Sequence, residues 1–215
     1  MSIAAPSETV ESVLSLHEPP VRLDATSAGM AMTAAEFDAV RDWDRDYRFE
    51  LVRGVVVASP AVSLGGRYPR IELVASLHSY ARTEKGRNAR VTVLHEHDIF
   101  IGDDRRRADL VVWCGISHEA IAENAVPTIA VEIVSKEKRD RHRDYVEKRA
   151  EYLAAGVREY WVFDRFRRTL TVCTTPTGDA GMSIVKADGS YRTDLLPGFV
   201  LSIGDLLAEA DRAGE

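Results

Sequence analysis

Two acidic residues on neighbouring predicted strands have the types and spacing that suit a metal ion. Glu132 interrupts an apolar run, residues 129–134, which reads as a strand buried on both faces. An ionised carboxylate in such a strand is costly unless it is paired, protonated or bound to a metal. Asp109 opens the preceding predicted strand, 108–113, so adjacent strands would bring the two acids together. Two such carboxylates suit Mg²⁺, which completes its shell with water and substrate phosphate.

Simpler explanations for the two acids remain open from the sequence. Glu132 is also consistent with an ion pair to an arginine at the end of its strand. Asp109 is also consistent with hydrogen bonds to backbone amides where its strand begins. Only if both side chains meet does the pair predict a site for phosphoryl chemistry, in which a metal lowers the pKa of its water and polarises a phosphoryl oxygen.

A lysine after these strands can supply the cation that stabilises developing phosphoryl charge. The position two residues after Glu132 is apolar, and lysines follow at 136, 138 and 148. Lys148 is the strongest candidate, because it lies on the predicted helix after the strand, with Asp144 one turn earlier on the same face. The spacing is equally consistent with an ordinary helix ion pair, which contributes only ~0.3 kcal/mol.

The elements that must position these residues are a mixture of helices and strands. A capping-box pattern at Thr33 and Glu36 predicts the start of the first helix, and Gly156 predicts a left-handed C-cap after the helix of Lys148. Periodicity predicts further helices at 71–83 and 203–209, and strands at 49–57 (two, turning near Arg53), 90–94, 98–101, 108–113, 129–134, 159–163, 169–173 and 198–202. This order indicates one α/β domain over residues 31–211, preceded by a loosely held arm, residues 1–30.

Short motifs around the acids follow a family pattern. They are Phe49-Glu-Leu-Val-Arg-Gly, Ala108-Asp-Leu-Val, Val131-Glu-Ile-Val-Ser135, and Asp144-x-x-x-Lys148-x-x-x-Tyr152-x-x-x-Gly156 followed by Glu159-Tyr-Trp161 and Asp164. With them the chain resembles the Uma family of putative restriction endonucleases, in the PD-(D/E)xK nuclease superfamily. The resemblance runs from about residue 32 to residue 207, and its densest part, 132–164, is the most specific.

The resemblance implies a restriction-endonuclease-like core, a mixed α+β sheet with flanking helices and β-hairpins. It also implies hydrolysis of phosphodiester bonds in nucleic acid, with Mg²⁺ or Mn²⁺ as the cofactor and DNA as the expected substrate. A homodimer is expected by analogy, since such nucleases often pair to cut two strands. Carried over by position, Asp109 and Glu132 are catalytic metal ligands, and Lys148 replaces the lysine missing after Glu132. The supporting residues are Glu50 (the upstream acid), Ser135 and Asp144.

Some positions depart from the family pattern and keep other functions open. Ala108 stands where a proline is expected before the metal-binding acid, and Lys136 stands where another is expected after Ser135. These changes are consistent with a catalytically degenerate nuclease fold that acts as a binding or assembly module. A metal-dependent hydrolase of another phosphoester is a third alternative. Both carboxylates are retained, so we expect an endonuclease.

Composition excludes several classes of protein. The chain has 215 residues, 45% of them hydrophobic, and a formal net charge of −6, as in an ordinary globular protein. The negative charge disfavours nonspecific coating of nucleic acid but allows one local basic strip. No apolar run approaches the ~18 residues of a membrane span, and no basic cluster marks a secretory signal. Cys114 and Cys173 lie in apolar runs and are expected to be reduced, which favours the cytoplasm.

Overall fold

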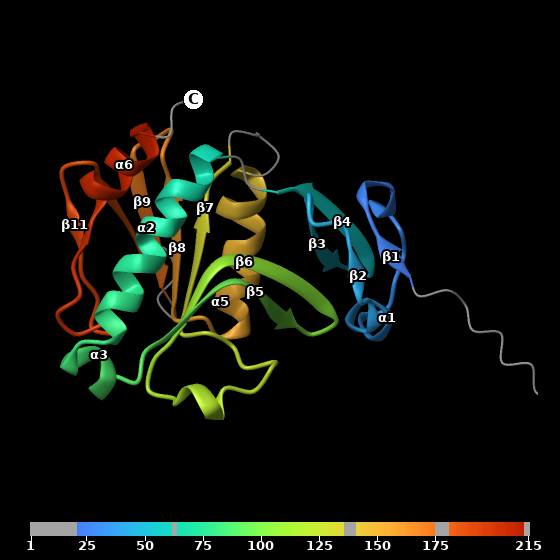
Figure 1. The fold of residues 1–215 in the computed structure, drawn as a ribbon, viewed down its shortest axis with the longest axis horizontal. Coiled ribbons are helices and arrows are strands. Elements are labelled where there is room, and N and C mark those ends of the chain that lie inside the picture. The colour runs from blue at the N-terminus through green and yellow to red at the C-terminus, as the bar shows by residue number, and fades with distance from the viewer. Residues whose placement is uncertain (1–20, 62–63, 136–140, 175–180, 213–215) are drawn as a thin grey trace, which may run out of the picture.

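The computed structural model describes residues 21–61, 64–135, 141–174 and 181–212 (Figure 1). An eight-stranded sheet in the order β10-β9-β8-β7-β6-β3-β4, with β5 also paired to β6, forms its centre. β7 and β8 are parallel, whereas the other neighbours are antiparallel. The strands are β3 (Tyr47–Val52), β4 (Val55–Pro60), β5 (Thr92–Ile101), β6 (Asp104–Trp113), β7 (Ile129–Ile133), β8 (Glu159–Asp164), β9 (Thr169–Thr174) and β10 (Met182–Lys186). The predicted mixed α+β sheet is confirmed.

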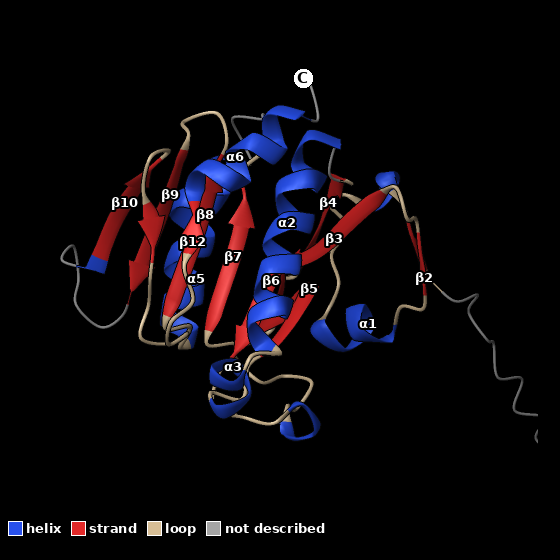
Figure 2. Ribbon diagram, turned by 60° about the vertical axis from the view of Figure 1, so that its left-hand side comes forward, coloured by secondary structure: helices blue, strands red, loops and turns tan. Residues whose placement is uncertain are grey.

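Helices cover both faces of this sheet (Figure 2). α2 (Leu64–Ala81) and α6 (Ile203–Arg212) lie on one face, and α5 (Lys148–Ala155) lies on the other. Alternate residues of a strand point to opposite faces, so β7 contributes to two cores. Val131 and Ile133 pack on the α2 side, and Ala130 packs on the α5 side. Glu132 therefore points toward α5.

The N-terminal elements build a smaller layer around the β3–β4 hairpin. They are β1 (Arg22–Leu23), α1 (Ala34–Ala39) and β2 (Asp42–Trp43). Their shared core contains Leu23, Phe37, Phe49, Leu51 and Val56. Part of the arm that we expected at residues 1–30 thus belongs to this layer, and residues 1–20 lie outside the described part of the chain.

Most predicted helices and turns have the predicted local chemistry. The Thr33 hydroxyl accepts from the Glu36 amide, and the Glu36 carboxylate accepts from the Thr33 amide, which completes the capping box. α5 ends at Gly156 with a φ of 106°. The helix predicted at 71–83 is α2, which begins earlier, at Leu64. Small elements complete the fold: α3 (Glu84–Asn88), β11 (Ser190–Tyr191) and β12 (Leu201–Ser202).

Several strand predictions were wrong in their boundaries, and of the strand predicted at 198–202 only β12 forms. The predicted strands at 90–94 and 98–101 are one strand, β5, because β6 pairs with it on both sides of Glu96, whose φ is 52°. Asp109 does not open a strand, because β6 begins at Asp104. The three arginines before Ala108 lie inside β6, and each pairs with a carboxylate: Arg105 with Asp38, Arg106 with Glu151, and Arg107 with Asp98.

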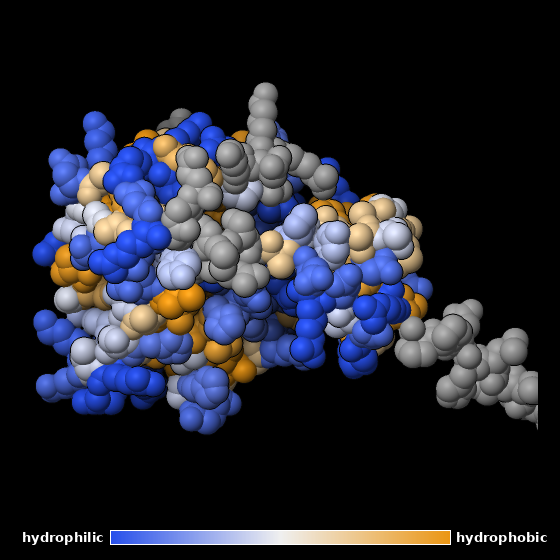
Figure 3. Space-filling model, turned by 45° about the horizontal axis from the view of Figure 1, so that its top comes forward, coloured by the Kyte–Doolittle hydropathy of each residue, from blue (hydrophilic) through white to orange (hydrophobic). Residues whose placement is uncertain are grey.

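The outer surface is mostly polar. On the face drawn in Figure 3, hydrophilic residues predominate and hydrophobic residues form small, separate groups. Among the described residues, no helix combines the length and apolar character that crossing a membrane requires.

Candidate active site

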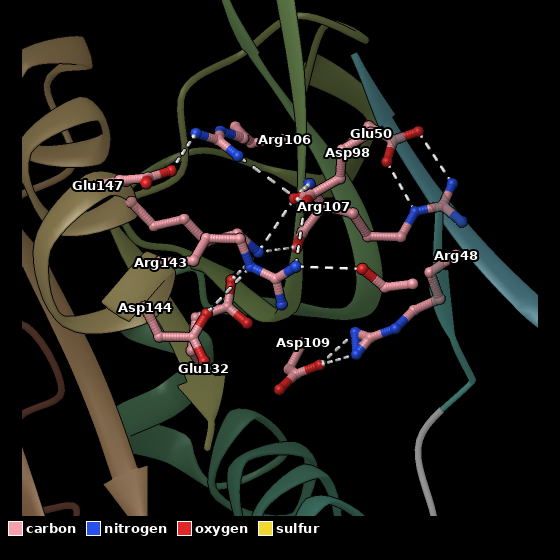
Figure 4. A network of polar contacts seen from close by, with 12 residues as sticks. Arg48, Glu50, Asp98, Arg106, Arg107, Asp109, Glu132, Arg143, Asp144 and Glu147 are labelled. Atoms are coloured by element: carbon pink, nitrogen blue, oxygen red, sulfur yellow. Dashed lines mark hydrogen bonds and ion pairs between the residues drawn. The ribbon is translucent and has the colours of Figure 1, made fainter. Parts of the chain in front are cut away.

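Strand β6 changes its partner along one edge, and the change leaves a gap in the sheet. Toward its end β6 pairs with β7 from Leu110 onward, and near its start it pairs with β3 at Arg105. Between these two paired stretches of β6, the Arg107 amide donates to Glu50 (2.8 Å) and the Arg107 carbonyl accepts from Lys148 (2.8 Å). Buried backbone groups require partners, so side chains from β3 and α5 take the place of a strand here (Figure 4).

Lys148 joins two buried carboxylates at this gap. Its Nζ lies 2.9 Å from Glu132 Oε1 and 3.0 Å from Glu50 Oε1. Glu50, Glu132 and Lys148 are all buried. The Tyr152 hydroxyl, one turn later on α5, donates to Glu132 Oε1 at 3.3 Å. Lys148 is therefore part of a buried ion-pair network rather than an ordinary surface pair.

Burial and neighbouring charge set the protonation states of this network. Burial raises the pKa of Glu132 to about 8, although Lys148 opposes the shift. Burial also acts to raise the pKa of Glu50, but nearby cations, Lys148 foremost, outweigh it and lower the pKa to about 2. Burial acts to lower the pKa of Lys148, but the surrounding carboxylates raise it. At neutral pH Lys148 is a cation, Glu50 is an anion, and Glu132 favours its protonated form until another cation approaches.

Asp109 lies beside this network and is held on both oxygens. Oδ1 accepts from Arg48 at 2.6 and 2.8 Å and also from Arg70. Oδ2 accepts from the Ile133 amide at 2.7 Å. The register that pairs Leu110 with Val131 places Asp109, one step further, opposite Glu132. The two acids that the sequence singled out are thus neighbours on adjacent antiparallel strands.

Asp144 precedes α5 in a π-helical turn, Arg143–Glu147. Its side chain is buried, and Oδ1 has no hydrogen-bond partner within the described part of the chain, although Arg143 Nε is 3.6 Å away. Burial raises the pKa of Asp144 to about 6. Single π-helical turns are frequent at functional sites, and this one holds a third acid close to Lys148, whose charge counters the shift.

Sequence reasoning missed the arginines of this site. Arg106 is 1% exposed, a burial that requires an acidic partner. Arg48 comes from β3 and Arg70 from α2, and both are far from Asp109 in sequence. The spacing of residues along the chain does not indicate that these arginines contact Asp109. Ser135, a predicted supporting residue, lies just past β7 and is partly exposed, and the lysines at 136 and 138 lie outside the described residues. The missed cations are Arg48, Arg70, Arg106 and Arg143.

The chemistry of these side chains fits a hard divalent cation. Burial raises the pKa of Glu132 and of Asp144 although Lys148 lies near both, and Asp144 Oδ1 has no hydrogen-bond partner among the described residues, so a further cation would stabilise the ionised form of each acid. Among the described residues, no group of three or more histidine, cysteine or acidic side chains is arranged to hold a metal ion. Mg²⁺ needs no such cage, because it binds one or two carboxylates together with water and phosphate. Asp109 and Glu132 are the residues that would hold it.

A polar pocket adjoins Asp109. Its volume is about 710 Å³, and both arginines that hold Asp109, Arg48 and Arg70, line it. The site therefore consists of a buried acid–lysine network next to an open, arginine-lined space.

Comparisons with known proteins show the fold and the family of this chain. The chain is similar in fold to a crystal structure from Anabaena variabilis ATCC 29413, described as a putative nuclease belonging to DUF820. The match has a TM-score of 0.67 at 16% identity and covers 83% of this chain and 99% of the other. No curated protein matches the chain. The family model of Uma2, described as "Putative restriction endonuclease", matches residues 34–204. This chain therefore belongs to the Uma2 family of putative restriction endonucleases, as the sequence motifs indicated.

Proposed function

We propose that this protein is a divalent-metal-dependent endonuclease that hydrolyses phosphodiester bonds, with DNA as its substrate. The observation that carries the proposal is the position of Lys148 between Glu132 and Glu50, next to Asp109, at the gap in the sheet. A buried cation shared by two acids is costly to maintain. Membership of the Uma2 family supports the nuclease class.

In the proposed reaction, Asp109 and Glu132 would hold Mg²⁺ or Mn²⁺, which would act as a Lewis acid and lower the pKa of a bound water. An ammonium group has three N–H donors, and those of Lys148 face Glu132, Glu50 and the Arg107 carbonyl. The Lys148 donor that faces Glu132 would orient the attacking water or neutralise charge on a phosphoryl oxygen. Glu50 and the Arg107 carbonyl keep the ammonium group in place during this step.

Further parts of the proposal concern assembly and location. We infer a homodimer, because cutting both strands of a duplex requires two such sites, and this part rests on analogy of fold. We infer a reducing, cytoplasmic environment from Cys114 and Cys173, which are both free thiols.

A noncatalytic binding module is the second candidate, and one observation favours it. Both oxygens of Asp109 already accept hydrogen bonds, from Arg48, Arg70 and the Ile133 amide. A carboxylate held in this way is stable without a metal. In that case the acids at the gap would only hold β3, β6 and β7 together.

Cleavage of plasmid DNA, single-stranded DNA and RNA separates the two candidates. The wild type is tested with Mg²⁺, with Mn²⁺ and with EDTA, alongside Asp109→Ala, Glu132→Gln and the control Asp211→Ala, whose acid is exposed and pairs with Arg168. An endonuclease requires metal-dependent cleavage by the wild type and the control, with a loss of roughly 100-fold or more in the other two. Absence of cleavage by the folded wild type with every ion and substrate would leave the binding module.

A further inference from the structure

Two arginines donate hydrogen bonds to Oδ1 of Asp109, the oxygen that a metal ion would bind. Arg48 donates to Oδ1 through both terminal nitrogens, and Arg70 donates to the same atom. The second oxygen is engaged by the Ile133 amide. A metal that binds Asp109 must therefore displace at least one guanidinium group. Arg70 would keep its ion pair with Glu96 at 2.6 Å, whereas Arg48 would lose both of its hydrogen bonds to Asp109, so a new anion would stabilise it.

The pocket beside Asp109 offers the place for that anion. Five arginines line it, against three acids: Arg41, Arg45, Arg48, Arg70 and Arg107. This local excess of positive charge contrasts with the net charge of −6 of the whole chain. It is a local basic region of the kind that the composition allowed, in which Arg70 and Arg107 join Arg41, Arg45 and Arg48.

Aromatic side chains line the same pocket. Trp43 and Tyr47 are both partly exposed there. Trp43 is held from behind by Phe37 and Phe49, with ring centroids 5.3 and 5.7 Å away. Positive charge along a groove combined with aromatic faces is the combination that binds a nucleic-acid strand, since bases stack on the rings and phosphates meet the cations.

We propose that this pocket binds a phosphodiester strand, and that Arg48 and Arg70 then exchange Asp109 for the phosphates of that strand, which frees Asp109 for the metal ion. The inference rests on the proposed nuclease function. Guanidinium groups bind phosphate in the same two-pronged geometry as carboxylate, so the exchange preserves the arginine hydrogen bonds. Without a strand, the arginines keep the metal site closed.

The exchange makes metal binding and strand binding depend on each other. Because coupling is reciprocal, a strand must raise the metal affinity by the same factor by which the metal raises the strand affinity. Phosphate ligation of the metal alone would also couple the two. The arginine exchange makes a further prediction, which ligation does not: weakening one arginine must raise the metal affinity when no strand is present.

The test measures Mn²⁺ affinity by electron paramagnetic resonance of the free ion, with and without a phosphorothioate DNA oligonucleotide that resists cleavage. The variants are Arg48→Gln and Arg70→Gln; each leaves the other arginine on Asp109, so the acid keeps one cation. Arg45→Gln is the matched control, because Arg45 lines the pocket and is not among the hydrogen-bond partners of Asp109. Thermal melting verifies that each variant is folded. If only one of Arg48→Gln and Arg70→Gln folds, that variant alone is enough for the test.

The expected result is Mn²⁺ binding on the order of tenfold tighter in Arg48→Gln and Arg70→Gln without DNA, with a smaller gain on adding DNA. Arg45→Gln should bind DNA more weakly and leave the Mn²⁺ affinity without DNA unchanged. Unchanged Mn²⁺ affinity in both of the first two variants, in a protein whose wild type binds Mn²⁺, overturns the exchange alone. A wild type that binds no Mn²⁺, with or without DNA, overturns the proposed function.

Discussion

The ammonium group of Lys148 lies 2.9 Å from Glu132 and 3.0 Å from Glu50 and is almost completely buried. Its remaining donor faces the Arg107 carbonyl at 2.8 Å. Through these contacts Lys148 links α5 to β3, β6 and β7, at the point where the sheet has a gap. The residue that we propose for catalysis is therefore also part of the framework of the site, and substitutions at the two ends of the ion pair have different consequences.

Replacing Lys148 with methionine should destabilise the fold strongly. The change leaves the ionised, buried Glu50 without its nearest cation, and removal of one partner from a buried ion pair costs about 3–5 kcal/mol. Urea unfolding followed by circular dichroism at neutral pH measures the loss. A variant with wild-type stability would show that the lysine does not compensate this acid.

Glu132→Gln should be far milder in the same assay. The raised pKa of Glu132 means that its neutral form is favoured in the metal-free protein, and glutamine has nearly the same shape as that form. We expect stability equal to or above that of the wild type, together with loss of cleavage. A loss of stability as large as that of Lys148→Met would contradict the protonation state assigned to Glu132.

Stability should depend on pH through the same residue. In the folded protein the pKa of Glu132 is about 8, against an ordinary value of 4.5, so the folded state retains a proton that the unfolded chain releases. The stabilisation from this proton is complete below about pH 4.5 and is lost as the pH rises toward 8. Between these values the unfolding free energy of the wild type should fall relative to that of Glu132→Gln.

The matched comparison separates Glu132 from other titrating groups, such as Asp144, whose pKa is raised to about 6. Both proteins contain Asp144, so its effect largely cancels in the difference between their unfolding free energies. Mg²⁺ should reduce the difference, because a bound cation stabilises the ionised form of Glu132. Parallel pH profiles for the two proteins would contradict the assignment.

Gly156 ends α5, the helix that carries Lys148. Its substitution therefore tests the framework of the site without changing a residue of the site. Its φ of 106° is unfavourable for other residues, and a Cβ there would meet no atom within 4 Å. Gly156→Ala should therefore destabilise the protein by about 1–2 kcal/mol through backbone strain alone. Gly156→Asn, which tolerates the left-handed region better, should lose less. Equal losses in urea unfolding would indicate a steric cause instead.

The sequence predicted those parts of the site that have a local signature. An acid inside the apolar strand of Glu132 is visible in one line of sequence, and so is the helix that carries Lys148 and ends at Gly156. The capping box at Thr33 has the same local character. In each case the neighbours along the chain determine the structure, and the prediction needs no knowledge of the fold.

The parts that were missed depend on contacts between distant segments. Arg48 and Arg70 reach Asp109 across 61 and 39 residues of sequence, and no periodicity encodes such a pair. The start of β6 was missed because arginines in a strand are acceptable only when acids from other elements meet them, as Glu151 meets Arg106. The pocket was missed partly for the same reason, since Arg70 and Arg107 reach it from elements distant in sequence from Arg41, Arg45 and Arg48.

A metal site at Asp109 and Glu132 is tested most directly by calorimetric titration with Mg²⁺ or Mn²⁺ in the presence of a nonhydrolysable DNA oligonucleotide. The wild type is compared with the double variant Asp109→Ala, Glu132→Gln and with the control Asp211→Ala. We expect binding to the wild type and to the control, and none to the double variant. Absence of binding to the folded wild type, with or without DNA, or equal binding to the double variant, would contradict a metal site at Asp109 and Glu132.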